Sequence, residues 1–101
     1  MIVYNVTVSI EESVREEWVR WMREEHIPDV LATGMFTGAK MYYLLTNADD
    51  DHGHNYTIQY TCESMERFRE YEDKYAPALR KATEEKFGGK FFVFRSLMQE
   101  V

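Results

Sequence analysis

The side chain best suited to acid–base chemistry is the imidazole of His26, because an imidazole changes charge near neutral pH. It follows Glu25 and comes two positions before Pro28. In a helix, Glu25 would share a face with Trp21, four residues earlier, and with Trp18, seven residues earlier. A carboxylate there could hold the imidazole in one tautomer and raise its basicity. The pattern predicts a catalytic pair, with His26 as acid/base and Glu25 orienting it.

His26 also has a structural interpretation. An imidazole near the C-terminal end of a helix interacts favourably with the helix dipole and can bond free carbonyl groups. One histidine with one carboxylate is a weak signal for catalysis. Both interpretations stay open, and neither the histidine nor the carboxylate is more than a candidate.

A ligand pocket for this pair would lie between the first helix and a sheet. Its expected walls are large apolar side chains at helical spacing, namely Trp18, Trp21, Met22, Tyr71 and Tyr75. Such walls favour a small hydrophobic ligand. An ordinary core uses the same spacing, so the periodicity does not separate a pocket from a packed interior.

Other reactive side chains give weaker signals. Cys62 ends a predicted strand on its buried face, with no evident cation to activate the thiol, so we expect a core residue. Residues 49–54 hold aspartates and histidines, but a solvated turn supports ligands poorly, and we predict no metal site. Lys40 and Arg95 interrupt apolar strands. Such charges protect sheet edges, although either could hold an anionic ligand or pair with Glu25.

The elements that must position these residues follow from changes in periodicity. Residues 2–10 alternate between apolar and polar types, which predicts a strand with one buried face. Residues 12–25 show a helical pattern. Pro28 should exclude an uninterrupted helix and push residue 27 out of α geometry. A short turn over 29–33 would follow and end at a glycine.

The second half of the chain repeats the alternation. Residues 35–46 and 55–62 read as two strands of a hairpin joined by a polar turn. Ser64 is a suitable N-cap for the next helix, which Pro77 should kink or split. Residues 90–98 form the last predicted strand.

This order, β-α-β-β-α-β, predicts an α+β fold of the ferredoxin-like kind, with residues 1–101 as a single domain. Right-handed crossovers give an antiparallel sheet with strand order 4-1-3-2 and both helices on one face. The other face would carry short, uncharged polar side chains on its two central strands. A freely solvated face usually recruits charged residues, so we expect a homodimer through the sheet face, with a monomer as the alternative. The edge strands would add Tyr42, Leu44, Phe92 and Phe94, or their neighbours.

Composition limits the partners. The formal net charge is −6, which disfavours nucleic acid and anionic membrane surfaces. No apolar run reaches the length of a membrane helix, and no signal-peptide pattern opens the chain. The single cysteine favours a reducing compartment, so we expect a cytoplasmic protein. No phosphate-binding loop or nucleophile elbow is present, and we predict no cofactor.

Three segments carry a resemblance to a known family. They are residues 18–36, with His-Ile-Pro followed by Ala-Thr-Gly, residues 56–62, and residues 86–95. Together they resemble a small bacterial family known only as domain of unknown function 4286. The resemblance implies a stand-alone ferredoxin-like domain similar to the dimeric α/β-barrel proteins, and it implies no reaction.

Two functions therefore remain open. The first is a homodimeric binding or interaction module without chemistry of its own. The second is a dimeric-barrel enzyme or ligand binder, such as a cofactor-free monooxygenase or isomerase, acting on a small hydrophobic substrate. A cavity beneath Trp18 and His26, together with a buried Glu25, would favour the second function.

Overall fold

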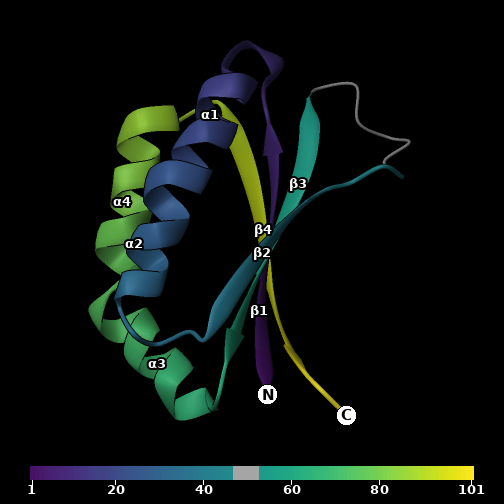
Figure 1. Cartoon of the computed structure of the whole chain (residues 1–101). Helices are drawn as coiled ribbons and strands as arrows, with labels where there is room; N and C mark the ends of the chain where they lie inside the picture. The colour runs from purple at the N-terminus through teal and green to yellow at the C-terminus, as the bar shows by residue number, and fades with distance from the viewer. Residues whose placement is uncertain (47–52) are drawn as a thin grey trace.

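The computed structural model describes residues 1–46 and 53–101. Its strands β1 (Ile2–Ile10), β2 (Gly38–Tyr43), β3 (His54–Cys62) and β4 (Phe91–Gln99) form one antiparallel sheet in the order β2-β3-β1-β4. Both long pairings span β1 completely, so β1 and β3 occupy the centre of the sheet (Figure 1). The predicted α+β fold and strand order are confirmed.

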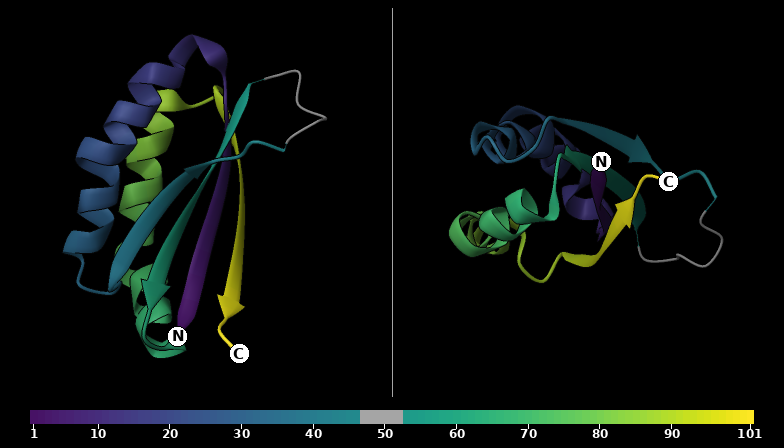
Figure 2. Two further views of the ribbon diagram at one scale, coloured as in Figure 1. Left: turned by 45° about the vertical axis from the view of Figure 1, so that its right-hand side comes forward. Right: turned by 90° about the horizontal axis from the view of Figure 1, so that it is seen from below.

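The helices cover one face of this sheet, as Figure 2 shows. The first helical segment combines a 3₁₀ turn η1 (Glu12–Val14), α1 (Arg15–Trp21), a π-helical turn η2 (Met22–His26) and α2 (Ile27–Ala32). The second combines α3 (Met65–Lys74) and α4 (Ala76–Phe87). No helix in the described part of the chain is both long and apolar enough to cross a membrane.

The core lies between the helix layer and the sheet. Alternate residues of the two central strands point into it, as the period of two predicts. On β1 and β3 these buried residues are Ile2, Tyr4, Val8, Ile10, Tyr56, Ile58, Tyr60 and Cys62. Trp18 and Phe87 are the largest fully buried side chains of the helix layer.

The predicted break before Pro28 is wrong. Ile27 has α-helical dihedral angles, φ −61° and ψ −45°, and the helical chain runs on through Pro28 to Ala32. The cause is the π-helical turn, which adds one residue to a turn and changes the hydrogen-bond register. Pro28 follows this turn at the start of α2, where its missing N–H costs little. Gly34, with φ +78°, follows α2 as expected of a helix-terminating glycine.

The predictions for the second helical segment are confirmed. The hydroxyl of Ser64 accepts a hydrogen bond from the Arg67 N–H and so caps α3. Pro77 lies in the first turn of α4, and the helix is split at Tyr75, where φ is −118°. The split turns α3 away from the direction of α4, as Figure 1 shows.

Strand β2 is shorter than the predicted 35–46. Phe36 is buried in the core rather than extended along the sheet edge, because the chain enters the strand directly from beneath α2. Backbone bonds still flank the strand, from the Thr37 N–H to the Thr61 carbonyl and from the Leu44 N–H to the Asn55 carbonyl. The predicted acidic tip at residues 49–52 lies outside the described residues.

The face of the sheet away from the helices has an uncharged centre and apolar edges. On β1 and β3 it carries the polar residues Asn5, Thr7, Ser9, Asn55, Thr57, Gln59 and Thr61, with Val3. Register places Tyr42 beside Thr57, and Phe94 beside Thr7, in one row across the sheet. Phe92 and Phe94 are 78% and 68% exposed. We call this surface, including Lys40 and Met98, the open sheet face.

Candidate functional site

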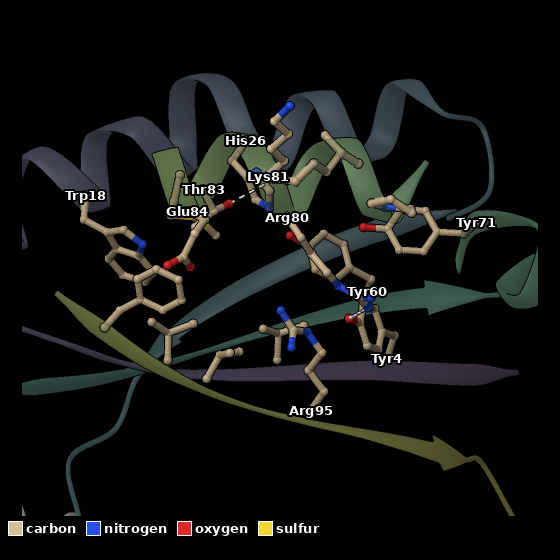
Figure 3. A pocket seen from close by; sticks show the side chains of 17 residues that line it. Tyr4, Trp18, His26, Tyr60, Tyr71, Arg80, Lys81, Thr83, Glu84 and Arg95 are labelled. Atoms are coloured by element: carbon tan, nitrogen blue, oxygen red, sulfur yellow. Dashed lines mark hydrogen bonds between the residues drawn. The ribbon is translucent and has the colours of Figure 1, made fainter. Parts of the chain in front are cut away.

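A pocket of about 490 Å³ lies between the helix layer and the sheet, a size typical of small-molecule sites. Figure 3 shows it with α1 to α2 and α4 above and the strands below. Val6 and Val8 of β1 and Phe91 and Val93 of β4 contribute its apolar floor. The remaining lining residues are Tyr4, Trp18, Met22, His26, Tyr60, Tyr71, Pro77, Leu79, Arg80, Lys81, Thr83, Glu84 and Arg95.

His26 reaches this pocket because of the π-helical turn. It ends η2 and stacks on Trp21, with ring centroids 4.9 Å apart and an interplanar angle of 26°. Burial lowers the pKa of His26 to about 4, and the nearby Asp29 carboxylate offsets only part of that effect. The imidazole is therefore neutral at physiological pH. It can form hydrogen bonds with a bound molecule, but it is a weak base.

Glu25 does not lie in the pocket, which corrects its predicted place on the apolar face. The prediction assumed a regular α-helix, in which positions 21 and 25 share a face. The extra residue of η2 turns position 26 inward instead and leaves Glu25 exposed. The catalytic roles suggested for His26 and Glu25 remain predictions. The exposed position of Glu25 does not support the expected contact in which its carboxylate orients the imidazole of His26 inside the pocket.

Three of the five predicted wall residues line the pocket, namely Trp18, Met22 and Tyr71. Trp21 is buried behind His26, where its ring meets the edge of Phe87. Tyr75 is half-buried at the junction of α3 and α4 and packs on the core without lining the pocket. Their role as ligand contacts remains a prediction.

A polar group that sequence reasoning missed closes one end of the pocket. Arg80 of α4 donates through Nη2 to the hydroxyl of Tyr4, at 3.4 Å. The same nitrogen meets both carboxylate oxygens of Glu72, at 2.9 and 2.7 Å. Because of these two contacts, Glu72 balances the charge of Arg80. The alternation in residues 2–10 places Tyr4 on the buried face of its strand, but only tertiary packing brings Arg80 over it.

Tyr60 and Tyr71 present hydroxyl groups to the same pocket. Their side chains are 3% and 5% exposed, and Figure 3 shows their hydroxyl ends directed into the cavity. Burial, strengthened by the neighbouring tyrosines, raises the pKa of each phenol. Both hydroxyls stay protonated and can donate. Neither has a hydrogen-bond partner within residues 1–46 and 53–101.

Arg95 lies at the mouth of the pocket on β4. It points from the strand toward the helix layer and interacts electrostatically with Tyr71 (Figure 3). Among the described residues it has no hydrogen-bond or ion-pair partner. Its place could have been found in the sequence, because Arg95 has the same parity in its strand as Phe91 and Val93. Lys40, the other charged residue in an apolar strand, points away from the helices. It lies on the open sheet face, apart from Glu25 and the pocket.

The remaining candidates have structural surroundings. Cys62 is fully buried, and its thiol donates to the Ser64 carbonyl at 3.1 Å, which confirms it as a core residue. His54 contacts Glu12 and accepts or donates a hydrogen bond at Nδ1 with the Tyr43 hydroxyl, at 2.8 Å. The described residues contain no group of three or more side chains arranged to hold a metal ion.

Comparison with known families settles the membership of the chain. The model of the family described as "Domain of unknown function (DUF4286)" matches residues 1–101. The chain belongs to this family. The sequence resemblance is thereby confirmed, and the DUF4286 description names no reaction. No curated protein matches the chain.

Solved structures resemble this DUF4286 chain over nearly its whole length. A dimeric ferredoxin-like protein from an uncultured marine organism is 11% identical, with a TM-score of 0.72 and coverage of 99% of this chain and 94% of that one. A hydroxynitrile lyase from Passiflora edulis is 16% identical, with a TM-score of 0.63 and coverage of 99% and 95%. A MhuD structure with two manganese protoporphyrin IX molecules per active site is 16% identical, with a TM-score of 0.66 and coverage of 100% and 94%.

These similarities establish the fold alone, because the identities are low. The DUF4286 chain has a ferredoxin-like fold, and some of its structural neighbours are enzymes or ligand binders. Any ligand or partner of this chain must be argued from its own residues.

Proposed function

We propose that this protein is a homodimeric binding domain that holds a small, largely apolar molecule in the pocket between its helices and its sheet. The observation that carries the proposal is the pocket itself. A domain of 101 residues has a thin core, and an opening of about 490 Å³ within it sacrifices packing that would otherwise stabilise the fold. A ligand would fill that space.

Binding fits the pocket better than acid–base catalysis. The imidazole of His26 is neutral and weakly basic where it stacks on Trp21, and Glu25 lies exposed away from it. A monooxygenase or isomerase that relies on this pair would need a stronger base at that point. Catalysis is the second candidate function, because proteins with a similar fold include enzymes such as the hydroxynitrile lyase.

The homodimer is supported by the open sheet face. Phe92 and Phe94 project from β4 beside the uncharged centre of the sheet, and Tyr42 is 45% exposed on the opposite edge. Contact with a second copy would remove these rings from water. The dimeric ferredoxin-like neighbour gives a precedent for such an assembly.

The test of ligand binding uses a neutral probe, methyl 2-naphthoate, measured by isothermal titration calorimetry and by a thermal-shift assay. Wild-type protein should bind the ester, and the bound ester should raise the melting temperature, because only the folded state has the pocket. Thr83→Trp should block binding, since Thr83 lines the pocket and a larger ring would occupy it.

Ala82→Trp is the matched control, because Ala82 is the adjacent, exposed residue of the same helix and does not line the pocket. It should bind the ester like the wild type. Absence of any binding by the wild type, or equal binding by Thr83→Trp, would contradict the proposed function.

A further inference from the structure

We propose that the pocket selects carboxylates, and that its ligand combines an apolar body with one carboxylate held by Arg95 and by the hydroxyl groups of Tyr60 and Tyr71. This inference rests on the proposed function, since it names the class of molecule that the pocket takes. It assigns to Arg95 and to the two tyrosines a binding role that the apolar walls alone do not provide.

The two tyrosines are the first evidence. A hydroxyl group that opens onto a cavity can donate a hydrogen bond to a molecule bound there. As whole residues Tyr60 and Tyr71 are more than nine-tenths buried, but their hydroxyl groups open onto the pocket and form no hydrogen bond with the residues described. Both are held in the protonated form. Two converging O–H donors suit an acceptor such as a carboxylate oxygen.

The second observation is the charge balance around the pocket. Arg80, Lys81 and Arg95 are the cationic lining residues, and Glu84 is the acidic one. Glu72, just outside the lining, pairs with Arg80 through both carboxylate oxygens. In Figure 3 the Lys81 ammonium points away from the cavity, and the Glu84 carboxylate lies at the Trp18 end. The cation at the end of the pocket that holds the two tyrosines, and that pairs with no described carboxylate, is Arg95, although the whole chain carries a net charge of −6.

Arg95 also has suitable chemistry and position. A guanidinium group binds carboxylates through two parallel hydrogen bonds, and the unpaired Arg95 has both available. Figure 3 shows Arg95 pointing from β4 into the pocket that Tyr71 also lines, and its charge partly offsets the rise in the pKa of Tyr71. Because Arg95 stands at the exposed mouth, the carboxylate would stay near water while the apolar body enters the cavity.

The far part of the pocket fits that apolar body. Val8, Phe91 and Val93 line the pocket near the Ile10 end of β1, and Met22 adds to its walls. Figure 3 shows Trp18 at the end of the pocket opposite Tyr71. These side chains offer no charge to a ligand. Glu84 lies toward the Trp18 end in Figure 3, away from Tyr71, so its carboxylate does not oppose an anion at Arg95. The pocket thus has Arg95 and the two tyrosine hydroxyls at one end, and mainly apolar walls with the single carboxylate of Glu84 at the other.

The experiment compares three probes that share one ring system and differ in charge. They are 2-naphthoate, its neutral methyl ester, and 2-naphthylmethylammonium, each titrated calorimetrically into the wild type, Arg95→Gln and Arg69→Gln. Arg69 is an exposed arginine of α3 outside the pocket and serves as the charge-matched control. Benzoate and methyl benzoate, tested alongside, cover a smaller ligand.

The wild type should bind 2-naphthoate at least tenfold more tightly than the ester, and the ammonium compound most weakly. Arg95→Gln should lose the preference for the acid but keep the affinity for the ester, which also shows that the variant folds. Tyr71→Phe and Tyr60→Phe should each weaken the acid several-fold and leave the ester unchanged. Arg69→Gln should match the wild type.

The outcomes separate the two proposals. Equal binding of acid and ester, an acid preference that survives in Arg95→Gln, or tighter binding of the ammonium compound would overturn the carboxylate inference while the proposed function stands. Failure of every probe, including the ester, would overturn both.

Discussion

Trp21 and His26 stack with their ring centroids 4.9 Å apart although five positions separate them in the sequence. In a regular α-helix such residues point roughly 140° apart around the axis. The π-helical turn Met22–His26 removes most of that difference and brings both rings to one side of the helix. This turn decides which titratable group faces the pocket, namely His26, and which faces water, namely Glu25.

The stack predicts acid sensitivity. The unfolded chain binds a proton on His26 near pH 6.5, whereas burial keeps the folded state neutral until about pH 4. The unfolded state therefore binds more protons between these values, and stability falls as the pH falls through that window, by up to about 3 kcal/mol.

The measurement is the free energy of urea unfolding at several pH values from 7.5 to 4 for the wild type and His26→Phe. The phenyl ring keeps the stacking on Trp21 and does not titrate. The advantage of His26→Phe over the wild type should grow as the pH falls. Parallel curves for the two proteins would show that His26 is not the acid-sensitive group.

A second prediction concerns the open sheet face. Phe94→Asp should convert the proposed dimer to a monomer, because it places a charge in the apolar edge of the proposed contact. Sedimentation equilibrium measures the mass. Leu97→Asp is the control on the same strand, since Leu97 is 42% exposed but lies on the helix side. A monomeric wild type, or a Phe94→Asp variant that stays dimeric, would contradict the proposed interface.

The third prediction compares alanine substitutions at two glycines, Gly53 and Gly38, of which the second serves as the control. A Cβ atom at Gly53 would lie 2.2 Å from the Ile10 carbonyl oxygen, a backbone atom that cannot easily move. Gly53→Ala should therefore lower the free energy of unfolding by about 1–3 kcal/mol, as overpacking does. At Gly38 the nearest atom would be the Thr61 hydroxyl oxygen at 3.6 Å, an ordinary contact. Gly38→Ala should change stability by less than about 1 kcal/mol, and similar losses for both variants would contradict the prediction.

The fourth prediction follows from the burial of Cys62. Its thiol is fully buried and bonded to the Ser64 carbonyl, so a thiol reagent should reach it only when the protein opens. The rate of reaction with Ellman's reagent should be very low in buffer and should rise with urea along the unfolding transition. Rapid labelling of the native protein would show that β3 opens locally at this end.

The sheet was predictable because its physical signal is local. The alternation in residues 2–10 and 55–62 identifies the central strands and their buried faces, and chain connectivity then limits the strand order. The split at Pro77 was predictable for a similar reason, because a proline removes one specific hydrogen bond.

The site was only partly predictable. His26 was recognised from its chemistry, but a π-helical turn has no sequence signature that would have placed Glu25 outside the pocket. The alternation in residues 55–62 placed Tyr60 on the face toward the helices, whereas Arg80 joins the pocket only because α4 packs over the sheet, and it carries no local signal of that contact. Arg95 was noticed as a charge in an apolar strand, yet its lack of a partner became visible only in three dimensions.

The pairing of β1 with β4 has a consequence for how the protein is made. Ile2 pairs with Gln99 and Ile10 with Phe91, so the strand of this sheet that is synthesised first needs the strand that is synthesised last beside it. While the nascent chain is still growing, β1 can join β3 but keeps its other edge open to chance partners. Closing a loop of nearly the whole chain raises the contact order, which slows folding. Residues 91–99 must therefore be available before the sheet is complete, and until then the free edge of β1 is the vulnerable surface of the growing chain.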